Sequence, residues 1–349
     1  MKHPIRQALT LGLLAAPGLS ALAQDVGLYG IADLYVGSIR GSDSRTVVNE
    51  GGNAVSRLGF RGREDLGGGL SAHFVLEMGL TMDNGTIPLG GGFGRQSFVG
   101  LQGPWGTVEA GRQYTPLFFN LLATVPFGMN ANWAPVQLAG SVDGQPAAAR
   151  TVGLAMRQSN LLRYRYGGGP RAKGLRVDVA VAPDEGAAGV GGILAFGASY
   201  RGERYFIGYA AQRLDSGSAA ATPFHNQTQG LNGSYAIGGL TLSAAYLVSD
   251  STAPGARRAA HTVLGAAYDL GPHRWMAELN RRDLRNSPND AQVMAVGYDY
   301  RLSKRTTLYG RLLRLNNQGT AANTLALAPV TAGSGDDVRA LALGIRHNF

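Results

Sequence analysis

Most of the chain consists of segments in which apolar and polar residues alternate with a period of two. In residues 54–65, for example, Leu58 and Phe60 alternate with Arg57 and Arg61. Successive side chains of a β-strand point to opposite faces, so this pattern gives each segment one apolar face and one charged face. The segments are joined alternately by short glycine-rich turns and by longer polar loops. Such regular repetition is typical of a transmembrane β-barrel.

Counting the alternating segments predicts sixteen strands. We expect them at residues 25–40, 54–65, 70–82, 94–103, 106–112, 157–167, 174–183, 191–201, 204–214, 229–237, 240–249, 260–270, 273–284, 291–302, 305–316 and 337–349. An even number places both termini at the same periplasmic rim. The alternative, a soluble sandwich of two sheets, needs a dry core between them, and here the polar faces carry too many arginines. The sequence therefore predicts an all-β fold, a 16-stranded antiparallel transmembrane β-barrel.

The first residues have the layout of a secretory signal peptide. Lys2 and Arg6 form a basic start, an apolar run follows, and an Ala-Leu-Ala sequence precedes Gln24. The alternative is a membrane anchor, but the apolar run is interrupted by proline and glycine and is shorter than the roughly 20 residues of a spanning helix. We expect residues 1–23 to be cleaved and residues 24–349 to form a single barrel domain.

Composition supports an exported channel and argues against a nucleic-acid partner. The formal net charge is +9, and removal of the signal peptide with its two positive charges leaves +7. Apart from Lys173 and Lys304, the remaining basic residues are arginines dispersed through the alternating segments. A basic run or a recognition helix, as expected for nucleic-acid binding, is missing from the sequence. The chain has no cysteine, so an exported protein of this size has no disulfides to stabilise it.

One long stretch departs from the alternating pattern. Residues 114–142 contain no Asp, Glu, Lys or Arg, and they show neither the period of a strand nor the length of a spanning helix. Loops of this length are uncommon unless they are functional or disordered. We expect the stretch to fold inward and narrow a pore. The alternative is a buried core helix at residues 116–123 of a soluble protein.

Several short motifs resemble those of the general porins of Gram-negative bacteria, particularly of beta-proteobacteria. The matching stretches are residues 26–30 (VGLYG), 56–62 (SRLGFRG), 64–70 (EDLGGGL), 98–101 (FVGL), 106–108 (GTV), 111–114 (GRQY), 300–306 (YRLSKRT) and the terminal Phe349. The similarity spans the mature chain. It implies a 16-stranded barrel, usually a homotrimer, located in the cell outer membrane of a Gram-negative bacterium.

The resemblance also implies particular roles for some residues and partners. The third loop, at about residues 113–149, is expected to enter the lumen as a constriction, with Arg57 and Arg112 facing it. Phe349 resembles the terminal assembly signal, so the partners include barrel-assembly machinery, outer-membrane lipid and lipopolysaccharide. General porins often carry an acid in a Pro-Glu-Phe-Gly-like sequence on this loop, whereas this chain has Val-Pro-Phe-Gly at residues 125–128.

The expected pore residues follow from strand alternation and from this resemblance. The pore arginines are Arg57, Arg61, Arg112, Arg163, Arg165 and Arg176, and the constriction loop includes Tyr114, Pro116, Phe118, Phe119, Pro126, Phe127 and Gly128. Arg112 shares its face with apolar residues, and an arginine facing the middle of the lipid costs about 2–4 kcal/mol. We therefore expect a bulge or strand end before it that turns the side chain inward. For each arginine the alternative is a rim or loop charge in water.

The predicted function is an outer-membrane channel for small hydrophilic solutes that prefers anions. No acidic residue lies between Glu109 and Asp143, so arginines are expected to dominate the narrowest part, and rings of charged side chains select ions. We expect no enzyme activity, cofactor or metal; the pair Asp336-Asp337 is weak evidence for Ca²⁺. The alternatives are a substrate-specific outer-membrane channel or, in a different class, a barrel enzyme or an adhesin.

Overall fold

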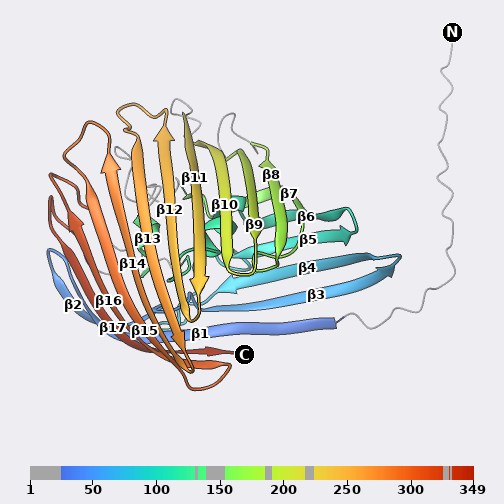
Figure 1. Ribbon diagram of the computed structural model, residues 1–349, viewed down its shortest axis with the longest axis horizontal. Helices are drawn as coiled ribbons and strands as arrows, with labels where there is room; N and C mark the ends of the chain where they lie inside the picture. Colours follow the sequence, from blue (N-terminus) through green and yellow to red (C-terminus); the bar gives the residue numbers. More distant parts are fainter. Residues whose placement is uncertain are drawn as a thin grey trace, which may run out of the picture.

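The strands form one continuous sheet that curves into a wall (Figure 1). The structure, a computed structural model, describes residues 25–129, 133–138, 154–184, 191–216, 224–324, 330 and 332–349. The expected signal peptide and parts of the expected constriction loop lie outside these residues. No helix within the described ranges is long and apolar enough to cross a membrane.

The described elements follow each other along the chain with short turns at one end of the wall. They are β1 (Asp25–Arg40), β2 (Ser44–Glu50), β3 (Arg57–Gly67), β4 (Leu70–Gly79), β5 (Gln96–Gly103), β6 (Gly106–Tyr114), α1 (Pro116–Leu122), the 3₁₀ helix η1 (Pro135–Leu138), β7 (Arg157–Tyr166), β8 (Gly174–Ala182), β9 (Ile193–Arg201), β10 (Tyr205–Ser216), β11 (Phe224–Ile237), β12 (Leu240–Ser251), β13 (Ala259–Leu270), β14 (His273–Leu284), β15 (Ala291–Arg301), β16 (Thr306–Asn317) and β17 (Val338–Asn348).

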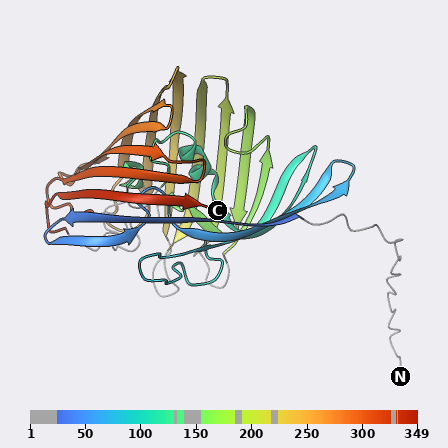
Figure 2. The same cartoon turned by 90° about the horizontal axis from the view of Figure 1, so that it is seen from below.

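The sheet closes on itself between its first and last strands. β1 pairs with β17 in antiparallel register from Ile31 opposite Asn348 to Arg40 opposite Arg339. At the short-turn end, the backbone N–H of Gly30 donates to the carbonyl of Phe349 (2.9 Å), and the N–H of Phe349 donates back (3.1 Å). Figure 2 shows the C-terminus beside β1. Closure pairs the first strand of the wall with the last, as a barrel in lipid requires.

The wall is sixteen strands around, as the alternation predicts, although the described residues form seventeen strand segments. The short β2 lies in residues 41–53, where the sequence analysis expects a loop. β2 pairs with residues 34–40 of β1, and β3 pairs with residues 25–31 of the same strand. The two segments therefore share one position of the wall. The prediction missed β2 because its alternating run is short and lies between glycine- and serine-containing turns.

The two faces of the wall differ as the alternation predicts. On the outside, Leu312 is 53% exposed and Leu343 is 66% exposed, whereas the inward Arg311 is 3% exposed and Glu278 is 2% exposed. Aromatic residues gather near the short turns, and Tyr268 stacks on Trp275 with ring centroids 5.9 Å apart. This arrangement fits the aromatic girdle of a barrel at the membrane interface.

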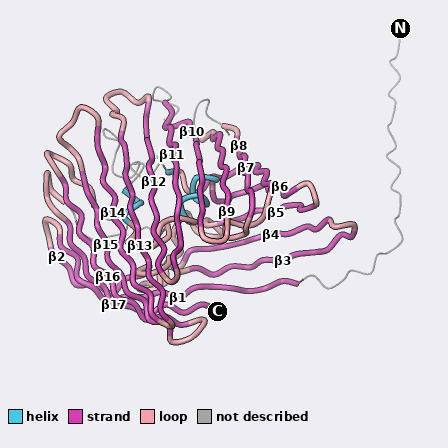
Figure 3. Tube along the Cα trace, in the orientation of Figure 1, coloured by secondary structure: helices cyan, strands magenta, loops and turns pink. Residues whose placement is uncertain are grey.

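The main hydrophobic core lies inside the wall and includes the connection between β6 and β7. Leu117 and Leu121 of α1, together with Trp133 and Val136 near η1, are buried in it. Figure 3 shows the helices within the curve of the sheet. The inner face of the wall is largely polar, so the apolar side chains of the connection supply much of the surface that this core buries.

Removing the C-terminal phenylalanine is expected to impair assembly of the barrel. Deletion of Phe349 removes both backbone hydrogen bonds to Gly30 and the ring that packs against it. Phe349→Ala keeps the backbone bonds and loses only the ring, so we expect an intermediate yield of folded protein. The heat-dependent shift in electrophoretic mobility measures the folded fraction. Equal folded fractions for the deletion and the wild type contradict this role.

Candidate pore constriction

The residues at the N-terminus of α1 favour helix formation. Thr115 is the N-cap, and its hydroxyl accepts a hydrogen bond from the N–H of Phe118. Pro116 takes the first helical position, where a missing N–H costs nothing. Leu117 and Leu121 lie one turn apart and are both buried. The apolar side of the short helix therefore faces the wall.

Polar side chains of the inner wall bind the backbone of the connection between β6 and β7. The Nδ2 of Asn232 on β11 donates to the carbonyl of Asn120 (2.7 Å). The Nδ2 of Asn280 on β14 donates to the carbonyl of Pro135 (2.9 Å). The Nε2 of Gln212 on β10 donates to the carbonyl of Leu154 (2.6 Å). Backbone groups in a buried connection need such partners, so these amides fix the connection against β10, β11 and β14.

Glu278 on β14 holds two separate parts of this connection. Its carboxylate accepts the N–H of Val136 (2.9 Å) and the N–H of Phe127 (3.4 Å). The residue is 2% exposed. Glu278 is therefore an anchor under the connection and not a charge that faces a solute.

Glycines on the inner wall leave room for the connection to approach. A Cβ on Gly265 of β13 would lie 2.6 Å from Cδ of Pro126, and a Cβ on Gly208 of β10 would lie 2.2 Å from Oδ1 of Asn120. Larger residues at these two positions would push the connection away from the wall. The two helices of the connection, α1 and η1, thus lie against the inner wall at β8 to β11 and at β14 and β15.

A first group of arginines gathers around Tyr114 and Glu77. Arg95 donates from Nε to Glu77 (2.8 Å) and from Nη2 to the Tyr114 hydroxyl (2.7 Å). The Nη2 of Arg157 donates to the same hydroxyl (2.6 Å), and its guanidinium lies 4.4 Å from the ring centroid. The Nη1 of Arg57 lies 3.9 Å from Glu77. Arg57 and Arg95 thus share the Glu77 carboxylate, Arg157 joins them at the Tyr114 hydroxyl, and Arg95 also interacts electrostatically with Glu50.

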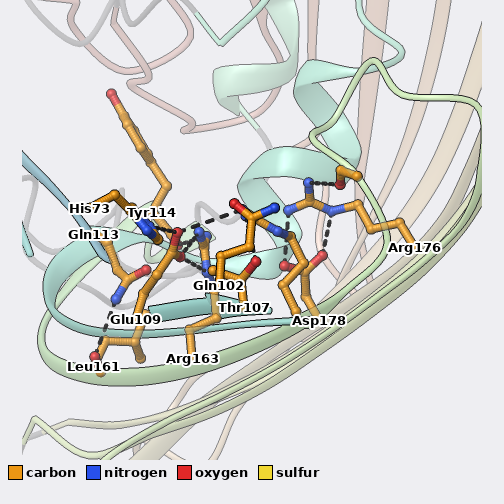
Figure 4. A network of polar contacts seen from close by, with 12 residues as sticks. His73, Gln102, Thr107, Glu109, Gln113, Tyr114, Leu161, Arg163, Arg176 and Asp178 are labelled. Carbon is orange, nitrogen blue, oxygen red and sulfur yellow. Dashed lines mark hydrogen bonds and ion pairs between the residues drawn. The ribbon is translucent and has the colours of Figure 1, made fainter. Parts of the chain in front are cut away.

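A second group gathers around Glu109, as Figure 4 shows. The Nε of Arg163 donates to Glu109 (3.0 Å), and the Nε2 of His73 lies 3.1 Å from the same carboxylate. The Nη1 of Arg165 lies 3.7 Å from Glu109, and its Nη2 donates to the Thr107 hydroxyl (3.1 Å). Two arginines again share one carboxylate.

Arg176 on β8 lies near the second group of arginines and contacts α1. Its guanidinium binds Asp178 through Nε (2.5 Å) and Nη2 (2.9 Å). The guanidinium groups of Arg163 and Arg176 lie 4.8 Å and 5.0 Å from the ring centroid of Phe119. Cations over an aromatic face are attracted to it. Phe119 of the connection therefore contacts arginines of the two neighbouring strands β7 and β8.

The other two arginines expected at the pore occupy different surroundings. Arg61 is exposed, with its guanidinium 5.3 Å from the Tyr29 ring centroid. Before Arg112, the register shifts between Gly111 and Gln113, and Gly111 has φ 130. Arg112 donates from Nε to the carbonyl of Gly94 (2.6 Å) and from Nη1 to the Ser159 hydroxyl (2.9 Å). Its contacts are thus separate from the group around Tyr114.

The remaining loop residues named from the sequence line a polar cavity of about 340 Å³. Pro126, Phe127, Gly128 and Trp133 form one side. The other side is rich in arginine: Arg171, Arg274, Arg301, Arg311 and Arg346, together with Asp299. Arg274 and Arg301 belong to the short-turn ends of β14 and β15. The basic surface therefore extends along the interior beyond the arginines of β3 to β8.

Sequence reasoning missed three residues that organise this region. Arg95 and Arg157 stand at the starts of β5 and β7, next to long connections, where too few alternating residues precede them to assign a face. Alternation along β14 gives Glu278 an inward direction, but its hydrogen bonds to Phe127 and Val136 join parts of the chain more than a hundred residues apart. The sequence therefore predicts arginines that act separately along the wall, whereas the structure groups them around Tyr114, Glu77 and Glu109.

Acidic residues at the far end of the wall are engaged in local contacts. Asp336 accepts the Ser42 hydroxyl (2.6 Å), and Asp337 accepts Nη2 of Arg314 (3.1 Å). Among the described residues, no group of three or more His, Cys, Asp or Glu side chains has an arrangement able to hold a metal ion.

Known proteins with similar sequences and structures share this architecture. A family model described as Gram-negative porin matches residues 8–320. Outer membrane porin protein 32 of Delftia acidovorans is 30% identical over 379 residues, which cover 99% of each chain. Major outer membrane protein P.IB of Neisseria gonorrhoeae is 29% identical over 338 residues, which cover 87% of this chain and 91% of the relative.

Solved structures agree with the sequence relatives. The anion-selective porin from Comamonas acidovorans superposes with a TM-score of 0.82 at 26% identity, covering 94% of this chain and 100% of that chain. OmpT of Vibrio cholerae shares the fold, with a TM-score of 0.67 at 14% identity and coverage of 95% and 100%. The chain therefore belongs to the family of Gram-negative porins, which are channels of the outer membrane and not enzymes.

Proposed function

We propose that this porin is a diffusion channel that prefers small anions. The observation that carries the proposal is the unequal charge across the interior. Arg57 and Arg95 share Glu77, Arg157 lies beside them on the Tyr114 hydroxyl, and Arg163 and Arg165 share Glu109. Residues 114–142 of the connection between β6 and β7 contain no acid. Arginine stays charged at any physiological pH. A solute that enters thus meets excess positive charge, and the described part of the connection offers it no carboxylate.

The electrostatic effect of the excess arginines is large enough to favour anions over cations. Two unit charges 4 Å apart interact with about 1 kcal/mol in bulk water and about 4 kcal/mol at an effective dielectric constant of about 20. A pore lies between these limits, so a few arginines in excess bias permeation severalfold. The similar structure from Comamonas acidovorans is that of an anion-selective porin, which supports the same preference. We further propose that the protein is a homotrimer, as its resemblance to general porins implies.

Swelling of protein-containing liposomes tests the preference with neutral and charged solutes. Small organic anions, cations and neutral molecules of matched size are compared at low ionic strength. We expect the anion to enter faster than the neutral molecule, and the cation more slowly. Equal rates, or faster entry of the cation, contradict the proposal.

Weakening the hydrogen bonds between Glu278 and the connection between β6 and β7 is expected to destabilise the open pore. Glu278→Gln keeps the size of the side chain, but it replaces one of the two oxygens that accept the N–H groups of Phe127 and Val136 with an NH₂ group, which cannot accept. We expect more frequent current fluctuations in single-channel recordings, with the barrel still inserted. Glu203→Gln is the matched control, because this exposed glutamate lies in a short turn and pairs only with Lys173 among the described residues. Equal current noise in both variants and the wild type contradicts the anchoring role.

A further inference from the structure

A second basic region lies at the short-turn end of the interior, on the inner face of β14 to β17. It surrounds the cavity of about 340 Å³, whose lining includes five arginines: Arg171, Arg274, Arg301, Arg311 and Arg346. Pro126 and Phe127 of the connection between β6 and β7 form another side. Short turns face the periplasm in such barrels, so the cavity lies between the connection and the periplasm. It is separate from the arginines around Glu77 and Glu109.

Three polar side chains of this cavity form a row across neighbouring strands. Arg301 of β15 lies opposite Thr307 of β16, and Thr307 lies opposite Arg346 of β17. Neighbouring strands are about 4.8 Å apart, so the backbones of the two arginines are about 10 Å apart. Arginine side chains are long enough for both guanidinium groups to reach one anion that lies between them, over the Thr307 side chain.

Two carboxylates bind three of the five arginines. Asp269 accepts hydrogen bonds from Nη1 of Arg274 (2.7 Å) and from Nη2 of Arg301 (2.5 Å). Asp299 accepts a hydrogen bond from Nη2 of Arg311 (2.6 Å). A guanidinium group has five N–H donors, so Arg274 and Arg301 keep donors for a ligand.

No described carboxylate binds Arg171 or Arg346. Asp33 of β1 lies opposite Arg346, but its carboxylate accepts hydrogen bonds from other groups: the Tyr309 hydroxyl (2.5 Å) and the N–H groups of Gly52 (3.0 Å), Asn53 (3.1 Å) and Ala54 (2.8 Å). Arg346 donates instead from Nη1 to Oδ1 of Asn53 (2.7 Å). Within the described ranges, neither Arg171 nor Arg346 forms an ion pair.

The cavity therefore carries more positive than negative charge. Five arginines line it, and counting Asp33, Asp269 and Asp299 against them leaves two positive charges. Glu278 of β14 is buried under the connection and does not belong to the lining. A phosphate monoester carries about two negative charges near pH 7, so one such group balances the excess.

The cavity also offers partners for hydroxyl groups. Asp299 accepts a hydrogen bond at Oδ2 from Nδ2 of Asn53 (3.1 Å), and a carboxylate oxygen has room for a further donor. The hydroxyl of Thr307 both donates and accepts. A bare phosphate ion would occupy the guanidinium groups and leave most of the volume to water. The cavity thus suits a ligand that combines a phosphate with a hydroxylated body.

We propose that this cavity is a binding site for small sugar phosphates on the periplasmic side of the constriction. Arg171, Arg301 and Arg346 bind the phosphate through N–H donors, for which their planar geometry is suited. The sugar hydroxyl groups bind Asp299 and Thr307. The site rests on the proposed diffusion channel, because solutes reach it through the lumen, but its residues are separate from the arginines around Glu77 and Glu109.

Block of the chloride current tests the site with three probes. Glucose 6-phosphate, glucose and inorganic phosphate are each added to both sides of a bilayer that contains the full-length, folded channel, and the concentration that halves the current is measured. We expect glucose 6-phosphate to block at the lowest concentration, because only this probe uses both the arginines and the partners for hydroxyl groups. Inorganic phosphate that blocks as well as glucose 6-phosphate overturns the proposal, since the cavity then binds a free anion only.

Removing the two arginines without an ion pair should weaken this block. In Arg171→Gln/Arg346→Gln, we expect the half-blocking concentration of glucose 6-phosphate to rise about tenfold or more, because hydrogen bonds to charged groups are the strong ones. Arg171→Gln alone changes an exposed side chain in a short turn, so the barrel folds as before, and the concentration should rise by a smaller factor. A half-blocking concentration that is unchanged in both variants overturns the proposal.

The matched control is Arg204→Gln/Arg305→Gln, which removes the same charge from short turns at the same end of the wall. Both arginines are exposed and lie outside the lining of the cavity, so block by glucose 6-phosphate should equal that of the wild type. An equal loss of block in this control overturns the proposal, because general charge at the rim then explains it.

The zero-current potential without added probe tests the anion preference separately. A channel that prefers potassium but is blocked most strongly by glucose 6-phosphate contradicts the proposed preference and supports this site. A channel that prefers chloride and is blocked equally by all three probes supports the preference and overturns the site.

Discussion

Arg57→Gln/Arg157→Gln/Arg165→Gln is expected to move the zero-current potential in a KCl gradient most of the way to the non-selective value. These arginines supply the positive charge that exceeds Glu77 and Glu109. The closer pairs formed by Arg95 and Arg163 remain in place, so no buried carboxylate loses its nearest cation. The barrel should therefore insert normally while chloride loses its advantage over potassium.

The control for this prediction changes charge on the other face of the wall. Arg213→Gln/Arg281→Gln removes outward arginines that do not line the interior, and the zero-current potential should stay at the wild-type value. A triple variant that is as selective as the wild type contradicts the assignment of selectivity to these arginines. Arg112→Gln is informative in addition, because the contacts of Arg112 with Gly94 and Ser159 place it outside the group around Tyr114. We expect its effect to be smaller.

Deletion of residues 116–136 is expected to raise the single-channel conductance severalfold and to admit larger neutral sugars. The deletion removes α1 and the segment anchored by Glu278, and with them the apolar core inside the barrel. The wall should persist, because its strands pair with each other through backbone hydrogen bonds that do not involve the connection. Single-channel recording and liposome swelling with sugars of increasing size measure the change.

A shorter deletion elsewhere controls for general damage to the loops. Residues 253–255 connect β12 and β13 at the same end of the wall, and removing them should leave the conductance near the wild-type value. If deletion of residues 116–136 leaves both the conductance and the sugar size limit unchanged, the connection is not the constriction.

The wall was predictable from the sequence because lipid and water impose opposite requirements on the two faces of every strand. This constraint repeats along the chain, so even a weak pattern in each segment gives the strand number and the closure of β1 with β17. β2 escaped detection because Val47 and Val48 lie in a run of only seven residues. Its assignment as a strand depends on hydrogen bonds to β1, and the local sequence pattern does not reveal these.

The pore-lining residues were predictable only in part, because several of them act through partners distant in sequence. Alternation places Arg163 and Arg165 inside, but it does not show that they share Glu109. The convergence of Arg95 and Arg157 on the Tyr114 hydroxyl depends on the path of two long connections. The anchoring role of Glu278 likewise depends on where the connection lies against β14.

The zero-current potential of the wild-type channel in a KCl gradient tests the central claim most directly. The account predicts a potential whose sign shows chloride preference. The preference should weaken when the salt concentration rises from about 0.1 M to about 1 M, because the Debye length falls from about 10 Å to about 3 Å. A channel that prefers potassium, or a chloride preference that does not change with salt, contradicts selection by excess arginine charge at the constriction.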